Sequence, residues 1–193
     1  MGREPRAEFA GATYHITCRG NNKRLIYLDD RDREVFLWHF RSSILRFGWR
    51  CHTYVLMNNH YHAIIETPEP NLAVGMCRLN GTYARLFNNR YGRRDHLFGG
   101  RYRPTLIETD EHFLEACRYV VLNPVRAELC EAPEEWRWSS FHVLAGLEPV
   151  PHWLEVAQLL GHFARARAVA RDRYVQFVTR GSRHASLSGL LAA

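Results

Sequence analysis

Apolar residues recur along the chain at two spacings, and these predict both strands and helices. Every second residue is apolar between Ala12 and Cys18, which is typical of a strand with one buried face. Apolar residues three or four positions apart predict helices over 30–47 and 71–88. Asp29 and Asp30 supply an N-cap for the first helix, and Gly48 fits the position just after its end.

The segment between these helices predicts a hairpin. Two strands are expected, Trp49–Met57 and His60–Thr67, with only Asn58 and Asn59 between them. So short a connection joins antiparallel strands.

The segment after the second helix predicts one more strand and one more helix. A polar, glycine-rich loop over 90–103 leads to a strand over 104–109, whose leading proline favours an edge position. A third helix is expected from a cap at Asp110 to about Asn123, because Pro124 follows. The order strand-helix-strand-strand-helix-strand-helix indicates the α+β class, with a ferredoxin-like antiparallel sheet, helices on one face and one added helix.

The C-terminal part shows a weaker pattern. Residues 136–140 are expected to cap a short helix, and the segments Trp153–Leu160 and Ala164–Val178 look helical. The tail from Gly181 to Ala193 is rich in Ser, Gly and Ala, and we expect it to be mobile. We therefore divide the chain into a main domain, 1–145, and a helical extension, 146–193.

Composition narrows the class of protein. The 193 residues carry a formal net charge of +6, which is compatible with a polyanionic partner. Five widely spaced cysteines without a C-x-x-C pair argue against a disulfide framework or a zinc ribbon. No apolar run approaches the length of a membrane span. These features predict a cytoplasmic protein without a membrane partner.

Two histidines on one strand are the first candidate for chemistry. His60 and His62 are separated by one residue, so both side chains leave the sheet on the same face. Two neutral imidazoles side by side can begin a metal site, although an isolated pair is more often a surface feature. Tyr119 and Asn123 lie four residues apart, away from the apolar arc of the third helix, and project together.

Two motifs resemble a known family. Asn59-His60-Tyr61-His62 resembles the HUH motif, and the run from Arg118 to Ala127 resembles the tyrosine-helix motif of REP-associated tyrosine transposases. These are single-tyrosine members of the HUH transposases. The similarity extends over Phe9–Gly20, His96–Tyr102 and Trp136–Phe141, and so covers about residues 9–145.

The resemblance implies a site and an activity. His60, His62 and Asn123 would be ligands of Mg or Mn, and Tyr119 would be the nucleophile. The implied function is a metal-dependent single-stranded DNA endonuclease and strand transferase acting at hairpin-forming repetitive palindromes. It would form a 5′-phosphotyrosine intermediate and work as a monomer or a homodimer. A free phenol is ionised to only about one part in a thousand at pH 7, so the nucleophile needs help.

Several further residues are candidates for DNA contact. Arg101, Tyr102 and Arg103 combine charge with an aromatic ring on a loop, as single-strand binding requires. Arg126 either contacts a phosphate or pairs with a neighbouring carboxylate. His15 and His112 are interpreted as structural and surface residues; a ligand role for His15 and a proton relay at His112 are the alternatives.

Three alternative functions are compatible with parts of this pattern. A domesticated hairpin-binding protein would recognise DNA without mobilising it. A replication initiator or relaxase would share the histidine pair, but the single tyrosine on a short helix, with no helicase domain, argues against it. A plain metallohydrolase with an H-x-H pair would form no tyrosine adduct.

Overall fold

The computed structural model describes residues 8–190, with side chains to residue 180, and is built around one antiparallel sheet. Its strand order is β2-β3-β1-β4. The strands are β1 (Ala12–Arg19), β2 (Arg50–Leu56), β3 (His60–Thr67) and β4 (Arg103–Ile107). With α1 (Asp30–Phe47) and α2 (Leu72–Tyr91) between them, they form the predicted ferredoxin-like arrangement, and β4 is an edge strand.

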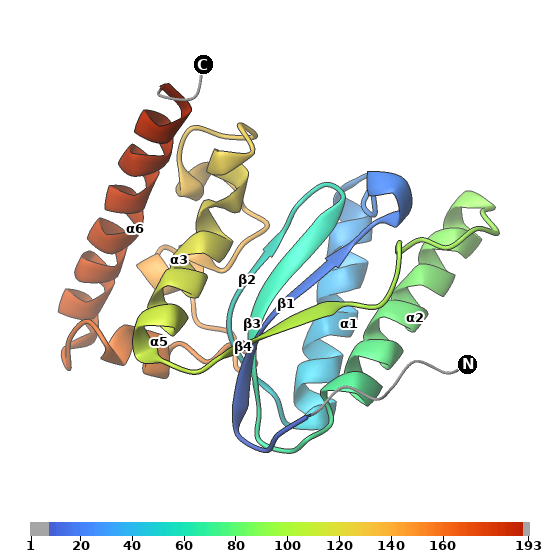
Figure 1. Ribbon diagram of the computed structural model, residues 1–193, viewed down its shortest axis with the longest axis horizontal. Helices are drawn as coiled ribbons and strands as arrows, with labels where there is room; N and C mark the ends of the chain where they lie inside the picture. Colours follow the sequence, from blue (N-terminus) through green and yellow to red (C-terminus); the bar gives the residue numbers. More distant parts are fainter. Residues whose placement is uncertain (1–7, 191–193) are drawn as a thin grey trace.

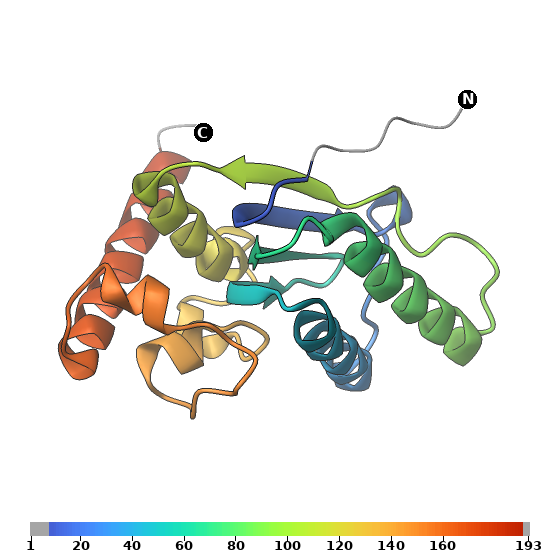
Figure 2. The same ribbon diagram turned by 90° about the horizontal axis from the view of Figure 1, so that it is seen from below.

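Helices lie on both sides of the sheet. The helices α1 and α2 cover one face, and α3 (Asp110–Arg126) lies on the opposite face (Figure 1). Seen at right angles, the sheet separates these two groups (Figure 2). The α+β class with an added third helix is therefore confirmed.

The ends of α1 and the core between α1, α2 and the sheet largely match the pattern of the sequence. The Asp29 carboxylate accepts a hydrogen bond from the Asp32 backbone amide, and Gly48 ends α1 with a φ of 66°. On the face of the sheet that α1 and α2 cover, Tyr61 packs against Phe36 of α1. Spacing by three and four residues from Leu72 predicts Leu86 on the buried face of α2, but Leu86 is 38% exposed and its neighbour Phe87 is buried in its place.

The helix α3 differs from the prediction at both ends. Thr109, and not Asp110, is the N-cap, and its hydroxyl accepts from the His112 amide at 3.2 Å. The helix also continues through Pro124 to Arg126. Proline removes one backbone hydrogen bond, but the buried ring of Pro124 packs into the core, and the Ala127 amide still donates to Asn123. Packing therefore prevails over the local preference of proline.

Short elements and one long helix complete the chain. They are η1 (Asn21–Lys23), η2 (Pro133–Glu135), α4 (Phe141–Ala145), α5 (Ala157–Gly161) and α6 (Arg167–Leu190). The predicted helix over 153–160 is wrong for its first half, since only α5 forms there. The helix α6 packs along α3, where Arg118 lies 4.5 Å from the centre of the Phe177 ring.

The expected mobile tail is mostly helical. The helix α6 extends through Gly181 to Leu190, and residues 191–193 lie outside the described residues. The boundary between a main domain and an extension at residue 145 stays a prediction. All five cysteines are free. Across residues 8–190, no helix combines the length and hydrophobicity needed to cross a membrane.

Candidate active site

The register of β1 and β3 brings polar side chains together on the face of the sheet toward α3. Thr17 lies directly opposite His62, and Arg19 lies opposite His60. Because paired residues share a face and side chains alternate along a strand, His15 lies on this face too. One strand pair therefore carries two histidines from β3 and one from β1.

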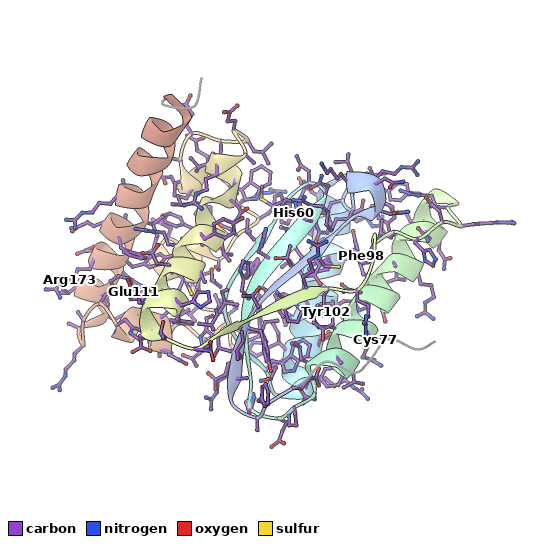
Figure 3. The ribbon with its side chains drawn as sticks, viewed as in Figure 1. His60, Cys77, Phe98, Tyr102, Glu111 and Arg173 are labelled. Atoms are coloured by element: carbon purple, nitrogen blue, oxygen red, sulfur yellow. The ribbon has the colours of Figure 1, made fainter. Side chains whose placement is uncertain are left out.

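The two histidines of β3 are neighbours. Their ring centres are 5.0 Å apart, with the ring planes at 79°. His60, which is labelled in Figure 3, is 8% exposed and His62 is 5% exposed, so both rings are largely buried and do not lie on an open surface.

Hydrogen bonds engage the Nδ1 atom of each ring. Nδ1 of His60 lies 2.6 Å from the Asn59 side-chain oxygen. Nδ1 of His62 lies 3.0 Å from the Thr17 hydroxyl and 2.9 Å from Nε2 of His15. These contacts leave Nε2 of each ring as the nitrogen that can bind a cation.

Burial keeps these imidazoles uncharged. It lowers the pKa of His60 to about 4, with a smaller contribution from the charge of Arg19. Burial also lowers the pKa of His62 to about 2, assisted by His15, His60 and Arg19. The pKa of His15 falls to about 4 through burial and the nearby His112. At neutral pH all three rings therefore keep the lone pair that metal coordination or hydrogen-bond acceptance needs.

Tyr119 approaches this cluster from α3. Its ring centre is 5.6 Å from that of His62 and 5.8 Å from that of His15. The side chain is 37% exposed, so the phenol is accessible and does not point into the apolar core. The Arg126 guanidinium lies over the same ring, 5.0 Å from its centre. This contact depends on the turn of α3 beyond Pro124, which carries Arg126.

Asn123 lies one turn after Tyr119 and is 8% exposed. Its side-chain nitrogen donates to the Tyr119 backbone oxygen at 2.8 Å. This bond orients the amide and leaves its oxygen available to a cation. Imidazole nitrogens and an amide oxygen are donor types that a divalent metal accepts. Among residues 8–190, no group of three or more His, Cys, Asp or Glu side chains is arranged to hold a metal.

A basic cavity of about 1140 Å³ lies beside the cluster. Its walls include Tyr119 and His62, and one carboxylate, Glu115. The basic residues that line it are Arg19, Lys23, Arg101, Arg103 and Arg126. Such a surplus of positive charge attracts a polyanion such as a phosphodiester chain.

The three predicted loop residues differ in their surroundings: Arg103 lines the basic cavity, Tyr102 lines a second hollow, and Arg101 borders both. Arg101 and Arg103 are exposed and line the basic cavity. Tyr102 is only 5% exposed and lies with Cys77 and Phe98 at a separate hollow beside α2 (Figure 3). The structure therefore does not support a stacking role for Tyr102, because its ring is packed into the core.

Two histidines outside the H-x-H pair, His15 and His112, also line the cavity. His112 is exposed, as expected for a surface residue, and lies in the cavity wall with Tyr119; the proton relay stays a hypothesis. His15, interpreted as structural, contacts both His62 and Tyr119. The alternating polar residues of β1 (Thr13, His15, Thr17 and Arg19) were the signal in the sequence.

Comparisons with known proteins find similarity to transposases. The family model described as "Transposase IS200 like" matches residues 8–122. A solved REP-associated tyrosine transposase bound to a REP hairpin is 18% identical, with a TM-score of 0.64, and covers 81% of this chain and 96% of its own. A proposed transposase from Deinococcus radiodurans is 16% identical, with a TM-score of 0.42, and covers 64% of this chain and 95% of its own. No curated protein matches the sequence.

Proposed function

The chain belongs to the family of IS200-like transposases, and from this premise we propose that it cuts and rejoins single-stranded DNA through Tyr119. Membership of the family implies DNA cleavage and transfer in general. The finer proposal is a metal-dependent endonuclease and strand transferase that acts at hairpin-forming repetitive palindromes. The observation that carries it is the accessible Tyr119 ring beside the buried His62, on the wall of a basic cavity.

In the proposed reaction Tyr119 attacks the phosphorus of a phosphodiester. The phenol gives up its proton, a bond forms between the phenolic oxygen and phosphorus, and the bond from phosphorus to the 3′ oxygen breaks. The released 3′ oxygen takes up a proton, and the 5′ phosphate stays attached to Tyr119. Since the ester bond is conserved, attack by another 3′-hydroxyl rejoins the strand without ATP.

His60, His62 and Asn123 are the proposed ligands of Mg or Mn. Their donor atoms fit such an ion. Both imidazoles are uncharged, and the hydrogen bond of the Asn123 side chain to the backbone uses its nitrogen and not its oxygen. A divalent ion held by these residues would act as a Lewis acid and offset negative charge that develops on the phosphate.

The basic wall is the proposed path of the DNA backbone. Arg101, Arg103 and Arg126 would contact phosphates next to the cut. Arg126 has a second contact, since its guanidinium covers the ring of Tyr119. A hairpin substrate is supported by the solved relative that holds a REP hairpin. The protein would act in the cytoplasm, as a monomer or a homodimer.

A covalent adduct is the decisive test. The chain is incubated with a labelled hairpin oligonucleotide that has single-stranded flanks, with Mn²⁺ or Mg²⁺, and analysed by denaturing gel and peptide mass spectrometry. We expect a 5′-linked adduct on Tyr119 and a free 3′-hydroxyl. Cleavage without an adduct would indicate a metallohydrolase. Tight hairpin binding without cleavage would favour a domesticated DNA-binding protein.

A further inference from the structure

His15 makes a contact that a purely structural residue does not need. Its Nε2 lies 2.9 Å from Nδ1 of His62, and the Thr17 hydroxyl lies 3.0 Å from the same atom. Both residues come from one face of β1, and Thr17 is paired directly with His62. Two polar groups of β1 therefore converge on one nitrogen of a histidine from β3.

The direction of these hydrogen bonds follows from the role of His62. An imidazole that binds a cation through Nε2 carries its hydrogen on Nδ1 and donates it to an acceptor. Nε2 of an uncharged His15 and the Thr17 hydroxyl are the acceptors within reach. Nε2 of His15 then carries no hydrogen, and its proton is on Nδ1.

We propose that His15 is a positioning residue, which holds His62 in the tautomer and ring orientation that bind the divalent metal. The inference rests on the proposed function of His62. His60 is held in a similar way, because its Nδ1 donates to the Asn59 side-chain oxygen at 2.6 Å. Each histidine of the pair thus has an acceptor behind it.

The placement of His15 also links the metal ligand to the nucleophile. Its ring centre is 5.1 Å from that of His62 and 5.8 Å from that of Tyr119. The Nε2 atom of His15 faces Nδ1 of His62, and so lies behind the ring and not at its metal-binding edge. This separates a positioning role from direct coordination.

Mn²⁺ affinity of the DNA-free protein tests the proposal without using activity. In His15→Leu the acceptor is removed and the apolar bulk is kept, whereas the Gln side-chain oxygen in His15→Gln reaches the place of Nε2. We expect Mn²⁺ to bind about 10- to 100-fold more weakly to His15→Leu. His15→Gln should restore affinity to within a few-fold of the original chain. Thermal unfolding of both metal-free variants should be cooperative.

Two controls test the second acceptor, Thr17, and the number of nitrogens that coordinate Mn²⁺. Thr17→Val removes the second acceptor and should weaken Mn²⁺ binding less than His15→Leu. Electron-nuclear double resonance of bound Mn²⁺ should show the same number of coordinated nitrogens in the original chain and in His15→Gln.

Other outcomes overturn the proposal in distinguishable ways. Unchanged Mn²⁺ affinity in His15→Leu would leave His15 a structural residue and the proposed function intact. Loss of one coordinated nitrogen in His15→Gln would make His15 a ligand. An original chain that binds no Mn²⁺ would overturn both this inference and the proposed metal site.

Discussion

Both faces of β3 are buried, and they differ in the kind of side chain that they bury. Toward α1 and α2 the strand presents Tyr61, Ala63 and Ile65, each at most 1% exposed. Toward α3 it presents His60, Ile64 and His62, with exposures of 8% or less. The first face has one polar atom in its row, the Tyr61 hydroxyl, and it donates to Asn80 at 2.8 Å.

The two faces of β3 contribute differently to stability, because one buries apolar side chains and the other buries imidazoles. Burying apolar side chains contributes favourably to folding, at about 25 cal/mol per Å² of apolar surface. Burying imidazoles gives no such gain, because their nitrogens lose water and recover only part of the hydrogen bonding. The two histidines on the α3 side therefore contribute little to folding, which is consistent with the proposal that they serve chemistry.

The largest expected effect comes from a pair of tyrosine substitutions, one on each face. Tyr119→Phe removes the attacking oxygen and should lower adduct formation at least about 1,000-fold while hairpin binding survives. Tyr61→Phe removes a core hydroxyl and should cost about 1 kcal/mol of stability with normal adduct formation. Denaturing gels and chemical unfolding measure the two. A Tyr119→Phe protein that still forms the adduct at the normal rate would refute the choice of nucleophile.

A second pair of substitutions, both in β3, separates an effect on cleavage from an effect on stability. His62→Leu should reduce cleavage about 100-fold or more without lowering stability, because it replaces a buried polar ring by an apolar side chain. Ile65→Ala should lower the free energy of unfolding by about 2–5 kcal/mol and leave cleavage by the folded protein unchanged. Urea unfolding and cleavage at saturating Mn²⁺ give the comparison. Equal losses of stability would mean that His62 is part of the core.

The core face was predictable from the sequence because its signal is local. Alternation places Tyr61, Ala63 and Ile65 on one side of β3, and the cap at Asp29 and Gly48 after α1 fix that helix. The H-x-H pair and the i, i+4 relation of Tyr119 and Asn123 are equally local. For these residues the sequence alone predicts which side chains share a face.

The remaining features of the site depend on contacts between distant segments. The continuation of α3 through Pro124 depends on the burial of that ring, and it places Arg126 over Tyr119. The contact of His15 with His62 depends on the register of β1 and β3. Neither follows from local propensity, since both need the packed structure. Tyr102 was misinterpreted for the same reason, because a polar loop sequence does not reveal which of its side chains turns inward.

A third comparison concerns basic residues on opposite sides of the sheet. Replacing Arg101 and Arg103 together by Ala should weaken hairpin binding and reduce its salt dependence. The slope of log K against log salt should fall by about 0.7 for each phosphate that the protein no longer neutralises. Arg85 is exposed on α2 and outside the cavity, so Arg85→Ala is the matched control and should leave the slope unchanged. Binding titrations at several salt concentrations measure this. An equal slope in all three proteins would exclude this wall as the DNA path.

The smallest expected effect on hairpin binding is at Tyr102. Its substitution tests whether this side chain belongs to the core and not to the DNA-binding surface. Because its ring is packed on the side of α2, Tyr102→Leu should lower stability by about 1–2 kcal/mol, the ordinary cost of disturbing a packed core residue. Hairpin affinity of the folded protein should change less than about two-fold, whereas loss of a stacked base would cost about 1–3 kcal/mol of binding. Unfolding curves and binding titrations on the same preparation separate the two. A large loss of affinity with normal stability would show that Tyr102 turns outward onto the DNA, and would return it to the binding surface with Arg101 and Arg103.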